Sequence, residues 1–150
     1  MNHEFARCFT KDLASLAKEV ELCDEETLLW YVPPGITNSI GNLTQHLMGN
    51  LHHFIGATLG ETGYVRNRDV EFSERYFTKA ELISELDKTA RMLETVLGSL
   101  TQEQLDKTYP YETFGYSMTT NHMIAKLASH LGYHLGQINY LRRISQGSKS

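Results

Sequence analysis

Two histidines, His130 and His134, are the residues of this 150-residue chain whose type and spacing point most directly to chemistry. In an α-helix, at about 100° per residue, they lie about 40° and one turn apart, so both imidazoles can reach one point beside the helix. The same wheel puts Met123, Leu127 and Leu141 within about 60° of His130, so the pair faces the inner half of the helix. Because imidazole is a common ligand of divalent metals, the spacing favours a metal-binding pair. A solvated pair or buried structural histidines are the alternatives.

A third histidine, His46, lies at the edge of the apolar face of another predicted helix. On the helical wheel it is about 60° from Leu43 and about 80° from Phe54. Three neutral imidazoles with one open position are typical of a catalytic zinc-type site rather than of a closed structural one. We therefore expect His46, His130 and His134 to meet in one cleft between two long helices.

Three further histidines, His52, His53 and His122, compete for the third ligand position. His53 shares the stripe of His46 at a spacing of seven residues and is interpreted as an alternative ligand or an outer group beside the ligands. Asn50 lies between these two and could orient a ligand through a hydrogen bond. His52 falls toward the outer face of the helix and is interpreted as a surface residue. The residues alone leave the choice between His46 and His53 open.

Four long amphipathic helices are predicted to position these residues, because apolar side chains recur at steps of three and four. Thr78 and Glu81 form the signature of a capping box at the start of the third helix, and Gly60 is well placed to end the second. The connection from Glu61 to Phe77 is longer than usual, which predicts a functional loop or lid. The predicted helices are Glu4–Cys23, Ser39–Leu59, Lys79–Leu97 and a last helix from Thr119 or Thr120 to Arg143. The fold class is therefore all-α, a four-helix bundle in a single domain over residues 1–150, with a short strand before the last helix left open.

The composition excludes several classes of protein. The formal charge of −4, from 14 basic and 18 acidic residues, shows no basic excess beyond Arg142 and Arg143, so we expect no nucleic-acid partner. Cys8 and Cys23 are separated by most of a predicted helix and fit reduced thiols better than a disulfide. The N-terminal residues lack the features of a signal peptide, and no stretch approaches 18 apolar residues. We expect a soluble, cytoplasmic protein with no membrane association.

The run SIGNLTQHL, which contains His46, and the run HLGYHLGQI, from His130 to Ile138, give the chain a resemblance to a known family. Together with the order of the helices, they resemble the damage-inducible DinB-like four-helix-bundle superfamily over nearly the whole chain. The resemblance implies a divalent metal, zinc or nickel, held by His46, His130 and His134, and it selects His46 over His53. The loop around residues 64–72 resembles a subgroup whose activity is not assigned.

The family also includes thiol-dependent transferases, which implies a metal-held thiolate as the nucleophile. A low-molecular-weight thiol would then be a small-molecule partner, and Arg66 or Arg68 could grip an anionic part of it. The alternative is that these arginines form ion pairs that rigidify the loop. Tyr64 belongs to the same candidate binding element.

Two other functions stay open at this point. One is a non-enzymatic bundle that binds a metal or ligand in the stress response. The other is a metal-dependent hydrolase, which is disfavoured because no acidic group is evident as a general base. Apolar residues outside the main stripe, among them Met48, Ile55 and Leu59, suggest a homodimer.

Overall fold

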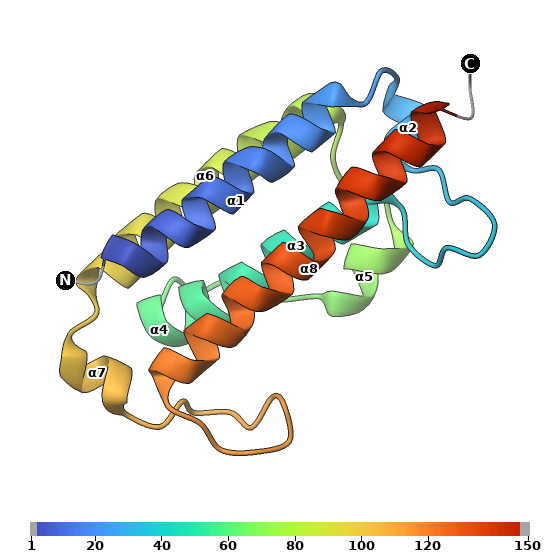
Figure 1. The fold of residues 1–150 in the computed structure, drawn as a ribbon. Coiled ribbons are helices and arrows are strands. Elements are labelled where there is room, and N and C mark those ends of the chain that lie inside the picture. Colours follow the sequence, from blue (N-terminus) through green and yellow to red (C-terminus); the bar gives the residue numbers. More distant parts are fainter. Residues whose placement is uncertain (1–2, 148–150) are drawn as a thin grey trace.

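Helices build the whole of the regular structure in residues 3–147, which are the residues that the computed structural model describes. Figure 1 shows α1 lying beside α6, and α8 packs against both α1 and α3. The predicted all-α four-helix bundle is confirmed. Its elements are α1 (His3–Leu22), α2 (Glu26–Leu29), α3 (Ile40–Leu51), the π-helix η1 (His52–Ala57), α4 (Thr58–Gly60), α5 (Arg68–Ser73), α6 (Lys79–Ser99), α7 (Gln102–Asp106) and α8 (Thr120–Gly147).

Side-chain caps fix where three of the long helices begin. The Ser39 hydroxyl accepts a hydrogen bond of 3.0 Å from the Asn42 backbone at the start of α3. Thr78 and Glu81 form a complete capping box at the start of α6, as the sequence predicts. Thr119 accepts from the His122 backbone N–H at 3.1 Å, which makes it the cap of α8. These caps satisfy backbone donors that a helix start leaves without partners.

The second predicted helix is regular only to Leu51. The structure continues it as η1, in which the backbone bonds span one residue more than in an α-helix, and then as α4. The predicted extent of this helix, Ser39–Leu59, is therefore confirmed, but the expectation of regular α-helical geometry is wrong beyond Leu51. The physical reason is that a π turn inserts a residue into the turn, so a 3.6-residue wheel no longer gives the direction of side chains beyond that point.

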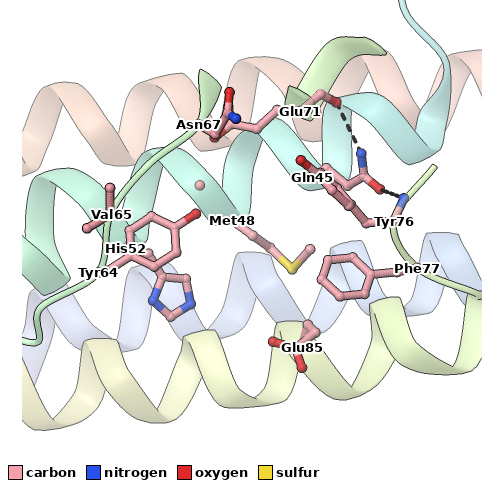
Figure 2. A pocket seen from close by; sticks show the side chains of 11 residues that line it. Gln45, Met48, His52, Tyr64, Val65, Asn67, Glu71, Tyr76, Phe77 and Glu85 are labelled. Atoms are coloured by element: carbon pink, nitrogen blue, oxygen red, sulfur yellow. Dashed lines mark hydrogen bonds between the residues drawn. The ribbon is translucent and has the colours of Figure 1, made fainter. Parts of the chain in front are cut away.

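The long connection between the second and third helices is a covering layer attached to α3. It contains the short helix α5, and the Glu71 side chain of α5 is buried. Asn42 donates to the Glu71 carbonyl oxygen at 3.0 Å, and Gln45 donates to the Glu74 carbonyl oxygen at 2.8 Å. Figure 2 shows Gln45 also bonded to the Glu71 carbonyl oxygen and accepting from the Tyr76 backbone. The polar residues of the SIGNLTQHL run thus hold this layer in place.

The extended segment before α8 forms an isolated antiparallel bridge between Thr108 and Thr119 and no strand among the described residues. The Tyr109 backbone N–H donates to the Met118 carbonyl oxygen at 2.8 Å. Cys8 is exposed and Cys23 buried, and the two thiols are free. None of the helices over residues 3–147 is long and apolar enough to cross a membrane.

The core consists of apolar side chains from all four long helices. Met48 and Ile55 are 5% and 0% exposed and belong to this core, while Leu59 packs against it. These residues therefore offer no exposed surface for the homodimer that their positions suggested, and a homodimer stays a prediction without that support. Fully buried members include Phe9, Leu13, Leu16, Leu47, Leu51, Leu82, Leu93, Met123, Ile124 and Ile138.

One ion pair ties α1 to α8 inside the bundle. Glu19 pairs with Arg142 Nε, and Asn139 Nδ2 donates to the other Glu19 carboxylate oxygen at 2.6 Å. Burial raises the pKa of Glu19, but the hydrogen bonds from Arg142 and Asn139 outweigh it, so the pKa lies below its ordinary value of 4.5. Arg142 is thus a structural residue rather than part of a basic surface.

Substituting Glu19→Gln is expected to lower the free energy of unfolding by about 2–3 kcal/mol at neutral pH. The reason is that Arg142 keeps its charge, loses its charged partner and stays largely shielded from water. The pKa of Glu19 is depressed in the folded state, so its contribution is present above pH 4.5 and is lost as the pH falls through the folded value. Urea unfolding across this range measures both effects. Glu21→Gln, which removes an exposed partner of Lys18, is the control and should change stability by less than about 0.5 kcal/mol.

Candidate metal centre

Three histidines from α3 and α8 converge, as the spacing of His130 and His134 and the resemblance to DinB-like proteins together predict. One nitrogen from each of His46, His130 and His134 lies within 4.8 Å of the other two. The Nε2 atoms of His46 and His130 are 3.3 Å apart. The rings stand edge to face, with interplanar angles of 80°, 89° and 88°. Three imidazole nitrogens this close to one another could bind one divalent ion together and leave a fourth position open.

The protonation of these imidazoles fits the same role. Burial and the neighbouring His134, His46 and arginine charges lower the pKa of His130 to about 4. Burial also lowers the pKa of His134, with a further contribution from His46 and against the effect of Gln137. Both rings are therefore neutral at pH 7, and a neutral imidazole carries the lone pair that a metal needs. The donor set fits a divalent metal.

Glu71 on α5 orients His46 from the side opposite the cluster. Its Oε1 lies 3.2 Å from His46 Nδ1. Arg66 Nη2 is also 3.3 Å from this nitrogen, but a guanidinium can only donate, so we assign the Nδ1 proton to the bond with the carboxylate. This tautomer leaves His46 Nε2 unprotonated toward His130 and His134, as in carboxylate–histidine–metal arrangements.

The carboxylate of Glu71 is itself fixed on two sides. Arg66 donates to both oxygens, from Nε to Oε2 and from Nη2 to Oε1, each at 2.9 Å. Burial raises the pKa of Glu71, yet the bonds from His46 and Arg66 together with the Arg66 charge lower it overall, so Glu71 is ionised. Gly49 of α3 lies so close to the carboxylate that an added Cβ would be 1.8 Å from Glu71 Oε2. Only glycine leaves room for the carboxylate at this position.

The other two histidines are held differently. His134 Nδ1 lies 2.7 Å from Gln137 Oε1, and Gln137 Nε2 donates to the Tyr133 hydroxyl at 3.2 Å. This fixes the His134 ring and leaves its Nε2 for the cluster. His130 Nδ1 is buried and has no hydrogen-bond partner among the described residues. The Phe72 ring stacks at 4.7 Å from the His46 ring and covers it.

The residues predicted to assist the ligands lie elsewhere. His53 is outside the cluster and packs edge-on against Phe54. It lies in the π-helix η1, where a wheel of 3.6 residues per turn no longer predicts the direction of a side chain. Asn50 is buried, but its Oδ1 finds no partner within residues 3–147, so the orienting position belongs to Glu71 instead. Sequence reasoning missed Glu71 because 25 positions separate it from His46.

His52 is half-buried, which corrects its interpretation as a surface residue. Its Nε2 lies 3.0 Å from the Thr89 hydroxyl of α6, and its ring lies 5.1 Å from the Tyr64 ring. The reason is the packing of the second helix against α6, which the wheel of a single helix does not contain. Tyr64 and His52 line a cavity of about 370 Å³ under the long connection, drawn in Figure 2.

The two arginines of the loop have different surroundings. Arg66 forms the ion pair with Glu71 that the sequence offered as the alternative to ligand binding, and its side chain is only 10% exposed. Arg68 is exposed and stacks over the Phe72 ring at 5.2 Å. Arg66 therefore pairs with Glu71 next to the three-histidine cluster, and the roles of Arg66, Arg68 and Tyr64 in binding a small molecule stay predictions.

The comparisons with known proteins agree with this architecture. The family described as protein of unknown function (DUF1572) matches residues 4–149. No curated protein matches the sequence. A DinB-like protein of Bacillus subtilis, YjoA, is similar at 18% identity and a TM-score of 0.72, over 95% of this chain and 92% of that one. A DinB-like protein of Bacillus cereus is similar at 17% identity and a TM-score of 0.71, over 95% of this chain and 91% of that one.

A third similar structure is YfiT from Bacillus subtilis, described as a probable metal-dependent hydrolase with an unusual four-helix bundle topology. It has 14% identity and a TM-score of 0.68, over 95% of this chain and 86% of that one. At these identities the likeness establishes the fold. The resemblance to DinB-like proteins, first noted in the two histidine-containing runs, is thus confirmed at the level of architecture.

Proposed function

The chain belongs to the DUF1572 family and has the DinB-like fold, and from this we propose that it is a metal-dependent enzyme that acts on a small molecule. The observation that carries the proposal is the convergence of three imidazole nitrogens within 4.8 Å, with His46 oriented by a buried carboxylate. A divalent metal such as zinc or nickel, if held by these imidazoles, would keep its full charge and would lower the pKa of a water or thiol bound to it.

The residues of the chain have separate tasks in this proposal. His46, His130 and His134 hold the metal. Glu71 keeps the His46 tautomer and ring direction fixed, while Phe72 excludes water from one side of that ring. Arg66 keeps Glu71 ionised and in place. None of these tasks requires a proton to move through Glu71.

Transfer of a low-molecular-weight thiol to an electrophile is the first candidate reaction. Supporting it, both oxygens of Glu71 accept hydrogen bonds from Arg66, so this buried carboxylate is not free to act as a general base. A thiol ionises more readily than water and needs no such base. Its proton would pass to solvent, and its sulfur would form a bond to carbon as a halide leaves or an epoxide opens.

Hydrolysis is the second candidate. It is supported by the fold shared with YfiT, which is described as a probable metal-dependent hydrolase. Three-histidine centres can supply the nucleophile for hydrolysis without a separate base, so the chemistry of the ligands admits it. The two candidates differ in whether sulfur or oxygen becomes attached to the product.

An assay with two arms tests the proposal. Untagged protein loaded with zinc or nickel is incubated with glutathione-like thiols and chlorinated or epoxide acceptors, and separately with esters and amides; mass spectrometry identifies the products. We expect a thioether product that forms at least about 100-fold more slowly after chelation and recovers when the metal is returned. The His134→Ala variant should behave like the chelated protein.

The outcomes separate the candidates. Hydrolysis products without thioether would assign the second reaction. Full metal loading without turnover in either arm would contradict an enzymatic role and favour a ligand-binding bundle, which is the remaining alternative.

A further inference from the structure

A cavity of about 640 Å³ opens beside the metal centre, between the loop of residues 33–38 and α8. His134 lines this cavity and also belongs to the three-histidine cluster. Its volume lies within the range of about 300–1,000 Å³ that is common for small-molecule sites. The cavity is therefore large enough for a substrate and shares a residue with the ion site.

The lining of this cavity is uncharged. Its wall includes Ile36, Tyr140 and Leu141. Its polar groups are His134 with the bonded Gln137 and Tyr133 hydroxyl, and Thr37 and Asn38 of the loop. Among the described residues, no Asp, Glu, Lys or Arg lines it. Removing a charged group from water without a partner is costly, whereas apolar surface gains free energy on burial. The cavity thus favours neutral, apolar ligands.

Several aromatic and aliphatic side chains here are largely exposed, although the Tyr133 ring lies 5.2 Å from the His134 ring and the Arg143 guanidinium lies over the Tyr140 ring at 5.7 Å. Ile36, Tyr133, Tyr140 and Ile144 are 46%, 65%, 66% and 64% exposed. Aromatic and aliphatic groups gathered around one opening are typical of a site that becomes covered when a ligand binds.

The second cavity, under the long connection, has a different relation to the ion site. It is lined by Glu71 and Gly49, on the far side of His46, and by none of the three histidines (Figure 2). It also contains the Glu85 carboxylate. A molecule bound there would face the back of the orienting carboxylate, so the cavity beside α8 is the one with access to the ion.

We propose that the cavity between residues 33–38 and α8 is the substrate pocket, and that it selects a neutral, largely apolar small molecule whose one polar or electrophilic group lies at the His134 end. This inference rests on the proposed function. It also predicts that a polyanionic thiol would not occupy this pocket and would have to approach the ion from another side.

Two dyes of the same skeleton test the pocket. N-phenyl-1-naphthylamine is neutral, and 1-anilinonaphthalene-8-sulfonate carries an added sulfonate. We expect the metal-free protein to bind the neutral dye at least tenfold more tightly in fluorescence titrations. Ile36→Glu and, separately, Ile144→Glu should weaken this binding at least tenfold, because each puts a carboxylate at the opening. Leu22→Glu, at a 41% exposed apolar residue of α1 that does not line the pocket, is the matched control and should change it less than twofold.

A second measurement places the dye relative to the ion. Loading with Co²⁺, which quenches nearby fluorophores, should reduce the fluorescence of the bound neutral dye in wild type but not in His46→Ala. If the wild-type protein binds Co²⁺ and the fluorescence of the bound dye does not fall, the pocket proposal is wrong while the proposed function still stands. If the wild-type protein binds no Co²⁺ but still prefers the neutral dye, the proposed function is contradicted instead.

Two other results would overturn the pocket proposal. Equal binding of the two dyes, or equal effects of Ile36→Glu and Leu22→Glu, would show that this cavity does not select neutral ligands. A wild type that sediments as a dimer and an Ile36→Glu variant that sediments as a monomer would identify a second copy of the chain as the occupant.

Discussion

Replacing His130 with alanine is expected to weaken zinc binding by at least about 100-fold, because it removes one of three ligands and leaves a pair that cannot complete the site. The effect should be large since His130 Nε2 lies only 3.3 Å from His46 Nε2, where both could bind the same ion. Metal analysis of protein purified without a histidine tag, followed by competition against a chromogenic chelator, measures the loss.

Two histidine variants serve as comparisons. His122→Ala lies on the same helix but is exposed and outside the cluster, so it should retain wild-type affinity. His53→Ala should also retain it, since the structure places this ring against Phe54. Equal metal content in wild type and His130→Ala would show that the three-histidine assignment is wrong, and loss in His53→Ala would restore that residue as a ligand.

Replacing Gly49 with alanine is expected to weaken metal binding by about 10–100-fold although all three ligands remain. The added Cβ would lie 1.8 Å from Glu71 Oε2, so the carboxylate must move and its bond to His46 Nδ1 is lost. Alanine favours a helix over glycine by about 1 kcal/mol, so helix propensity cannot be the cause of a loss. Chelator competition measures the affinity, and thermal unfolding of the metal-free protein reports on the fold.

Gly132→Ala provides the matched control for this substitution. Gly132 lies in α8 between two of the ligands, and an added Cβ would meet nothing within 4 Å. It should bind metal as wild type does and unfold at the same or a higher temperature. If Gly49→Ala binds zinc as tightly as Gly132→Ala, the close approach of Glu71 to α3 has no role in the metal site.

The long helices could be predicted because each carries its own apolar stripe and several carry their own caps. The pair of His130 and His134 followed from a spacing of four within one helix, which local geometry fixes. His46 needed the resemblance to DinB-like proteins, since the residues alone did not separate it from His53. Local patterns thus account for the architecture and for two of the three clustered histidines.

What could not be predicted depends on contacts distant in sequence or on departures from regular backbone. Glu71 is one of many acidic residues in a polar segment, and only the path of the connection across α3 brings it to His46. The π turn of η1 has no distinct sequence pattern, yet it changes where the side chains after Leu51 point. Similarly, the open cavity beside α8 depends on the loop of residues 33–38, which lies about 100 positions from α8 in the sequence.

The buried Nδ1 of His130, which has no partner within the described chain, bears on ion selectivity. Two of the three rings are fixed from behind, His46 by Glu71 and His134 by Gln137. The third ring has no such bond at Nδ1 among the described residues, so only its neighbours His46 and His134 and the surrounding packing set its direction. A centre in which one donor is held less firmly than the other two would discriminate less by ion size, and the supply of zinc and nickel in the cell would then weigh more in which one it carries.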